Sequence, residues 1–183
     1  EEASEAEEAD AVIVNTCSFL ASATSESIER TLELAEANTE GVRNRPIVMC
    51  GCVPSRYGDD LPAELPEVAA FVRADAEDGI VSVMDGVLGR ESAVPAAVGS
   101  SAGPLAEPLR TVEGASAYVK ISDGCDRFCS FCAIPYIRGR YPSRPYAEIE
   151  PEVLALAKSG VREFVLIGQD TGIWGSDFEG DQT

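Results

Sequence analysis

Short β-branched apolar runs alternate with amphipathic stretches along the first half of the chain. The run AVIVN is followed by a polar stretch in which Ile28, Leu32 and Ala35 recur at helical spacing. The run PIVMC repeats this order of strand and helix. We expect strands at 11–15, 46–50 and 70–72 and helices at 22–40 and 78–88. Such alternation predicts an α/β fold with a parallel sheet and helices on its faces.

A change of composition divides the chain. Residues 89–114 are rich in Ala, Ser, Pro and Gly and show no sustained periodicity, which is typical of a connection between domains. Beyond them we expect a strand at 117–122, a helix at 145–159 and a strand at 163–167. One such unit cannot close a β/α barrel by itself. We therefore predict domains at 1–88 and 115–183, a linker at 89–114, and a chain that is a piece of a longer protein.

Composition and charge narrow the classes of function. A hydrophobic share of 45% is enough for a core, whereas the apolar runs are too short to cross a bilayer and no export signal opens the sequence. We expect a cytoplasmic protein that does not bind membranes. The net charge of −18 repels a phosphate backbone, so we do not expect this segment to bind nucleic acid directly. Six of the acidic residues lie within residues 1–10, where we expect a disordered tip.

The six cysteines are better metal ligands than disulfide partners in the reducing cytoplasm. Histidine is absent, which removes the usual general base and the commonest zinc ligand. Chemistry must therefore come from cysteines, carboxylates or a cofactor.

Three of the cysteines, Cys125, Cys129 and Cys132, form a CxxxCxxC pattern directly after a predicted strand. They are close enough in sequence to surround one small cluster. A structural zinc site or an ordinary four-iron centre takes four ligands, so three thiolates would leave one iron open to a small molecule. Zinc binding and buried, unliganded cysteines are the alternatives.

The CDRFCSFC segment resembles the cluster loop of the radical S-adenosylmethionine superfamily. The resemblance implies a [4Fe-4S] cluster whose open iron is chelated by S-adenosylmethionine, with one electron cleaving that cofactor to methionine and a 5′-deoxyadenosyl radical. Phe131 matches the aromatic residue that packs near the adenine, although a core phenylalanine is an equal alternative. The sequence Gly168-Gln169-Asp170 ends a predicted strand, where α/β folds bind ligands, and resembles the element that approaches the methionyl amino group.

Two further cysteines end predicted strands in the first half. Cys17 follows the first strand and Cys52 the second, so parallel strands would bring both thiols to one edge of the sheet. By spacing alone they are either ligands of a second cluster or small buried hydrophobic residues. We interpret Cys50, inside the second strand, as structural.

Several motifs resemble the methylthiotransferase family, in the family's order along the chain. They are VNTCSF from Val14, GCVPSRYGD from Gly51, and the stretch from SDGC at Ser122 to GRYPSRP at Gly139. The resemblance implies an amino-terminal flavodoxin-like domain with an auxiliary [4Fe-4S] cluster on three cysteines, a radical barrel and a small carboxy-terminal β-domain. Cys17 and Cys52 match two auxiliary ligands. The first auxiliary cysteine normally lies in a strand that this chain lacks.

Within the family, the NTCSF stretch and the sequence QDT from Gln169 are most similar to the RimO type. That similarity implies addition of a methylthio group to the β-carbon of an aspartate in the small-subunit ribosomal protein S-twelve, with a flavodoxin-type or ferredoxin-type electron donor. The alternatives are a tRNA adenosine methylthiotransferase of the MiaB type and a non-catalytic iron–sulfur module. We assign no catalytic side chain, and we expect this fragment to be inactive alone.

Overall fold

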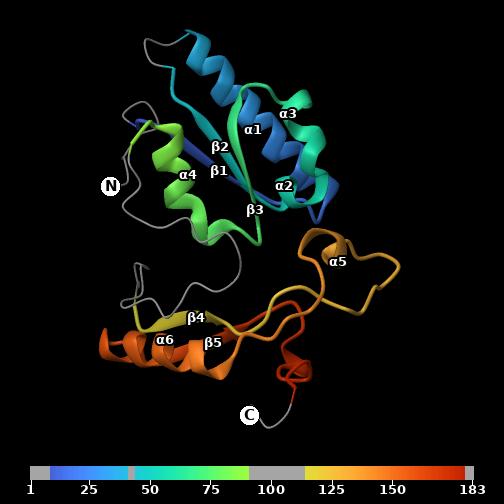
Figure 1. Ribbon diagram of the computed structural model, residues 1–183, viewed down its shortest axis with the longest axis vertical. Helices are drawn as coiled ribbons and strands as arrows, with labels where there is room; N and C mark the ends of the chain where they lie inside the picture. Colours follow the sequence, from blue (N-terminus) through green and yellow to red (C-terminus); the bar gives the residue numbers. More distant parts are fainter. Residues whose placement is uncertain (1–8, 41–43, 91–113, 180–183) are drawn as a thin grey trace. The chain divides into compact units, whose positions relative to one another are not determined.

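A computed structural model describes residues 9–40, 44–90 and 114–179, which form two compact units divided between residues 100 and 101 (Figure 1). Most of the predicted linker at 89–114 and most of the acidic tip lie outside the described residues. The predicted domain limits therefore stay a prediction.

The first unit is built on a parallel sheet. Its strands are β1 (Val12–Thr16), β2 (Ile47–Gly51) and β3 (Val68–Arg73), in the order β1-β2-β3. Thr16 pairs with Gly51 in the register, so β1 and β2 end at the same level. The predicted α/β class with parallel strands is confirmed.

Two longer helices and several short ones surround this sheet. They are α1 (Ala21–Glu40), α2 (Cys52–Tyr57), α3 (Leu61–Glu64) and α4 (Ile80–Val87), with 3-10 turns at Gly58–Asp60 and Glu77–Gly79. The periodicity predicted α1 and α4 to within a few residues. It missed α2 because six residues are too few to show a helical repeat; Pro54 lies in the first turn, where proline is tolerated.

The first unit has a hydrophobic layer on each face of β2. Ile47 and Met49 pack in the layer that includes Ile28 and Leu34 of α1. The alternate residues Val48 and Cys50 pack against apolar side chains of α4. All five residues of β2 are buried, as expected for a strand covered on both sides. Leu32, which the periodicity also suggested for the core, is 43% exposed, so the buried stripe of α1 is shifted toward Leu34.

The second unit contains the parallel strands β4 (Ser116–Lys120) and β5 (Glu163–Ile167). The helix α6 (Tyr146–Lys158) packs on one face, where Val119 and Leu156 are fully buried. The short helix α5 (Ile134–Ile137) lies in the long loop between β4 and α6, and a 3-10 turn (Thr171–Ile173) follows β5.

β5 is much less covered than β2. Its residues Val165, Leu166 and Ile167 are 38%, 55% and 38% exposed. An apolar strand of this composition is typical of a sheet that is buried on both faces.

None of the helices among the described residues combines the length and apolar character that crossing a bilayer requires.

Candidate cysteine sites at the strand ends

The cysteine loop of the second unit is closed at its neck by backbone contacts. The Cys125 N–H donates to the carbonyl oxygen of Gly139 at 3.3 Å. Gly124 has a φ of +64°, and a Cβ at this position would overlap the carbonyl of Arg140. The two ends of the loop can approach this closely because residue 124 has no side chain and tolerates a left-handed conformation.

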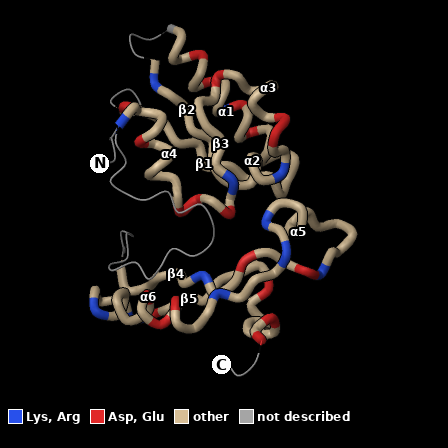
Figure 2. Tube along the Cα trace, viewed as in Figure 1, with Lys and Arg blue, Asp and Glu red and all other residues tan. Residues whose placement is uncertain are grey.

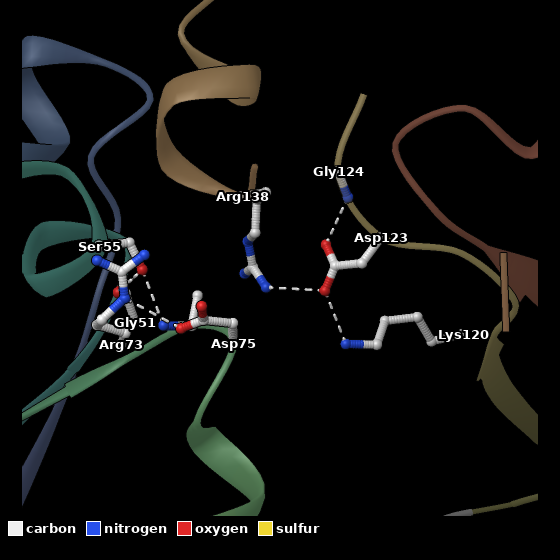
Figure 3. Close-up of polar contacts among 9 residues, drawn as sticks. Gly51, Ser55, Arg73, Asp75, Lys120, Asp123, Gly124 and Arg138 are labelled. Atoms are coloured by element: carbon white, nitrogen blue, oxygen red, sulfur yellow. Dashed lines mark hydrogen bonds and ion pairs between the residues drawn. The ribbon is translucent and has the colours of Figure 1, made fainter. Parts of the chain in front are cut away.

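Asp123 adds a charged contact at the same neck. Its carboxylate lies 3.0 Å from the ammonium of Lys120 and 3.6 Å from the guanidinium of Arg138, and it accepts a hydrogen bond from the Gly124 N–H (Figure 3). Lys120 ends β4 and Arg138 follows α5, so this carboxylate joins the strand to the far side of the loop.

The three cysteines of the loop line a single hollow of about 350 Å³. Cys125 and Cys132 are partly buried and Cys129 is exposed. The Cys132 N–H donates to the Cys129 carbonyl oxygen at 3.0 Å, which makes the tight turn between the last two cysteines. None of these cysteines is in a disulfide. The fold therefore brings the three predicted ligands to one cavity.

The donor set suits a cluster of several metals. Among the described residues no group of three Cys, Asp or Glu side chains could hold a metal ion. Thiolates that share one zinc ion must converge, since each binds at about 2.3 Å. In an iron–sulfur cluster each thiolate binds a different iron, so the sulfurs surround the cluster instead. Three thiols around an open hollow fit that second arrangement.

Two residues that follow β5, Gln169 and Asp170, line the same hollow. The Asp170 carboxylate, only 14% exposed, lies 2.7 Å from Nε of Arg127. This hydrogen bond and the charge of Asp170 raise the pKa of Arg127, and the nearby Cys125 and Cys129 raise it further. Arg127 thus links the cysteine loop to the end of β5.

Aromatic residues of the loop are displayed at the surface. Phe131, which lines the hollow, is 86% exposed, so it is not a core phenylalanine. Phe128 has a φ of 45°, a strained conformation for a bulky residue, and its ring meets Tyr136 edge to face at 6.1 Å. Strain of this kind is concentrated at functional sites.

Gly168 lies against Ser122, the first residue of the SDGC motif, to which the sequence assigned no role. A Cβ on Gly168 would overlap the Ser122 hydroxyl, so glycine is needed for the close approach. Ser122 is 2% exposed, and its Oγ has no hydrogen-bond partner among the described residues. Its place in the SDGC motif does not by itself show that it contacts Gly168, 46 positions along the chain.

The arginines of the loop region are paired with carboxylates. The pairs are Arg127 with Asp170, Arg138 with Asp123, Arg140 with Asp126, and Arg144 with Glu148 and Glu152. Basic and acidic residues accordingly alternate in this part of the chain (Figure 2). The local excess of arginine in the sequence therefore becomes a set of ion pairs.

The first unit carries its cysteines at the ends of β1 and β2. Cys17, directly after β1, is exposed, and Cys52, directly after β2, is partly buried. Because Thr16 and Gly51 are register partners, both cysteines leave the sheet at the same edge. Cys50 is 7% exposed in the layer beneath α4, where burial and then Glu77 raise its pKa. This burial agrees with the structural role that we expected for Cys50.

Two family models match the chain, one in each half. The model described as "Uncharacterized protein family UPF0004" matches residues 1–73, and that of the "Radical SAM superfamily" matches residues 119–179. The second match includes the cysteine loop and the residues that follow β5.

Curated relatives match across both halves. A protein of Symbiobacterium thermophilum named "Ribosomal protein uS12 methylthiotransferase RimO" is 41% identical over 94% of this chain and 36% of its own length. Proteins of the same name from Lachnoclostridium phytofermentans and Acetivibrio thermocellus are 38% and 39% identical, over 94% and 98% of this chain and 39% and 41% of their own lengths. The chain therefore spans about two fifths of the length of these relatives.

Proposed function

The chain is related to the methylthiotransferase family of radical S-adenosylmethionine enzymes, and we propose that it is part of an enzyme that adds a methylthio group to the β-carbon of an aspartate in ribosomal protein uS12. The relationship predicted from the motifs is confirmed by relatives that match almost the whole chain. The reaction and substrate are proposals because the chain spans about two fifths of those relatives.

One observation carries the proposal, namely that three cysteine thiols from a single loop line one open hollow beside Gln169 and Asp170. In the proposed site Cys125, Cys129 and Cys132 hold a [4Fe-4S] cluster through thiolate bonds. When bound, the cluster and S-adenosylmethionine supply one-electron cleavage of the sulfonium, which yields the radical that attacks an unactivated carbon.

The other residues of the hollow orient the cofactor. Asp170 and Gln169 present a carboxylate and an amide that suit a methionyl ammonium group. Phe131, with its exposed ring, offers a stacking surface for adenine. Gly168 keeps the end of β5 close to Ser122. No side chain is assigned a proton-transfer step.

The first unit supplies part of a second cluster site. We assign Cys17 and Cys52 as two thiolate ligands of an auxiliary [4Fe-4S] cluster, because they leave adjacent strands at one edge of the sheet. The sequence offers Cys50 as the remaining cysteine of this half, and that thiol is buried on the far side of β2 from the α1 layer. The donor set is therefore incomplete, and we propose that the 183-residue chain does not turn over alone.

The proposed partners follow from the proposed reaction. The substrate is ribosomal protein uS12, and a flavodoxin-type or ferredoxin-type protein donates the electron. We place the enzyme in the cytoplasm, where this substrate is made. We propose no direct nucleic-acid contact for this segment because its charge of −18 repels phosphate.

Anaerobic reconstitution with iron and sulfide tests the cluster. We expect about four irons per chain at the loop, lost in Cys129→Ala and retained in the matched control Cys50→Ala. S-adenosylmethionine should change the electron paramagnetic resonance spectrum of the reduced cluster. Retention of iron in Cys129→Ala, or zinc in place of iron, would refute the assignment.

The substrate is tested with a full-length enzyme that contains this sequence. Mass spectrometry of ribosomal protein and of tRNA after the reaction distinguishes the two classes of acceptor. A methylthio group on uS12 supports the proposal, whereas one on tRNA adenosine would replace it with the MiaB-type alternative.

A further inference from the structure

The two cysteines of the first unit lie on chain segments that lead into different helices as soon as the strands end. After β1 the chain enters α1 through residues 17–20, whereas after β2 it turns directly into α2, whose first residue is Cys52. Backbone pairing fixes Thr16 against Gly51 but does not extend to the cysteines. Side-chain contacts beyond the sheet therefore set how the segments that carry the two cysteines lie against each other.

The hydroxyl of Thr16 makes one such contact. It donates to the Cys50 carbonyl oxygen at 2.7 Å and accepts a hydrogen bond from the Val53 N–H at 3.1 Å. Thr16 precedes Cys17, and its two partners lie on either side of Cys52 in the sequence. Since Thr16 is 5% exposed, water does not readily replace these bonds.

Arg56 of α2 makes a second contact between the same segments. Its Nη1 donates to the Ser18 carbonyl oxygen at 2.6 Å. Ser18 follows Cys17 and is fully buried. Thr16 and Ser18, the two neighbours of Cys17, are thus both bonded to the segment that carries Cys52.

Gly51 allows the segments to lie this close. Its φ is +98°, and a Cβ would stand 2.7 Å from the Thr16 carbonyl oxygen and 2.8 Å from Oδ1 of Asn15. On the other side of the same turn, the Ser55 hydroxyl donates to the Gly51 carbonyl oxygen at 3.0 Å and accepts from the Ala74 N–H at 2.8 Å (Figure 3). The turn that carries Cys52 is therefore hydrogen-bonded both to the end of β1, through Thr16, and to the residue after β3, through Ser55.

We propose that Thr16 and Arg56 are positioning residues that hold Cys17 and Cys52 as a preformed pair of thiolate ligands for a thiophilic metal centre. Neither residue contacts the metal, since each bonds the backbone next to a cysteine. The inference rests on the proposed function for the identity of the metal centre, but the pairing of the thiols can be measured without a cluster.

Cadmium binding tests the pair directly. In the 183-residue chain, Cys50→Ser, Cys125→Ala, Cys129→Ala and Cys132→Ala leave Cys17 and Cys52 as the two thiols. Cd²⁺ is titrated into the protein, and its binding is followed by the ultraviolet absorption of the cadmium–thiolate bonds. We expect Thr16→Val to weaken binding about tenfold or more, as loss of an outer-shell partner does, and Thr16→Ser to restore it. Arg56→Met should weaken binding less, because Arg56 is exposed to solvent.

Thr31→Val is the matched control. Thr31 is fully buried, but its hydroxyl bonds the Ser27 carbonyl oxygen within α1 and not a strand end. We expect it to leave Cd²⁺ affinity unchanged, with far-UV circular dichroism reporting folding in every variant. Wild-type affinity in folded Thr16→Val, or equal weakening in Thr31→Val, would overturn the proposal.

Arg56→Met decides the case if Thr16→Val does not fold: weakened binding supports the proposal and unchanged binding rejects it. The cadmium test uses a chain without the loop cysteines, so its result does not depend on iron binding at the loop. If the wild-type loop bound no iron while Cys17 and Cys52 still bound Cd²⁺ as a pair, the proposed function would be contradicted and the positioning role would stand.

Discussion

In the first unit two cysteines come from the ends of separate strands, whereas in the second unit three cysteines come from one loop after a single strand. The first arrangement depends on the sheet, because β2 is buried on both faces and sets the register of β1. The second depends on the loop itself, which is closed by Gly124 and by ion pairs while β5 remains exposed. Candidate ligands can thus be positioned by core packing or by local geometry.

This difference decides which changes should disturb each site. A core substitution in the first unit should move the strand ends that carry Cys17 and Cys52. In the second unit, substitutions on β5 should matter little, and changes at the neck of the loop should matter most.

Met49→Ala in β2 should have the largest effect on stability. Met49 is fully buried, and truncation there should lower the free energy of unfolding by about 2–5 kcal/mol. Leu166→Ala in β5 is the comparison, and its 55% exposure predicts a change within about 0.5 kcal/mol. Urea unfolding followed by circular dichroism measures both variants.

The single tryptophan, Trp174, reports the second unit separately. We expect Met49→Ala to leave the tryptophan fluorescence transition in place while the circular dichroism transition shifts. Equal shifts of both signals would mean that the two units unfold together, and the comparison would fail.

Gly124→Ala should have the next largest effect, with Gly139→Ala as its matched control. Both glycines have positive φ, of +64° and +78°, so each alanine should cost about 1–2 kcal/mol in backbone energy. At Gly124 the added Cβ also overlaps the Arg140 carbonyl, whereas the space at Gly139 is open. We therefore expect Gly124→Ala to cost more and to lower the iron bound after reconstitution.

Equal losses of iron in these two variants would mean that iron binding depends on the left-handed backbone at each glycine and not on the close approach of the two ends of the loop at Gly124. That result would contradict the steric account of how the cysteine loop closes.

The sequence predicted most of what local patterns can encode. The strands and longer helices followed from periodicity, and the spacing of Cys125, Cys129 and Cys132 identified residues that line one hollow. What it could not predict are contacts between distant segments. The Thr16 bonds to the backbone around Cys52 and the closeness of Ser122 to Gly168 depend on strand register, which no local pattern shows.

The α2 helix and the pairing of Arg127 with Asp170 were missed for a related reason. A helix of six residues has no measurable period, and an ion pair across 43 positions needs the loop and β5 in place. The sequence shows four arginines in the loop region, but only the fold shows which carboxylates they pair with.

Arg127→Gln should shift the reduction potential of the [4Fe-4S] cluster that we propose at the loop. Arg127 carries a positive charge beside Cys125 and Cys129, and that charge favours the reduced, more negative cluster. Its loss should lower the midpoint potential on the order of tens of millivolts, the scale of a screened surface charge. Arg140→Gln, 76% exposed and paired with Asp126, is the control and should change it less. An unchanged or higher potential in Arg127→Gln would refute this electrostatic role.

Asp177→Asn should have the smallest effect and should depend on pH. Burial alone would raise the pKa of Asp177, but hydrogen bonds from Ser143 lower it below its ordinary value of 3.8. The lowered pKa means that this carboxylate stabilises the folded protein above pH 3.8 and that the contribution disappears as the pH falls below that value. Asp177 is exposed, so the change should be small.

Trp174 is well placed to report this change, because the N–H of its neighbour Gly175 donates to the Ser143 hydroxyl at 2.8 Å. Thermal unfolding followed by tryptophan fluorescence should show that the Asp177→Asn substitution lowers the melting temperature more at about pH 7 than at about pH 3, because the contribution of the carboxylate declines as the pH falls below 3.8. A difference of the same size at the lower pH would show that the effect does not come from the charge of the carboxylate.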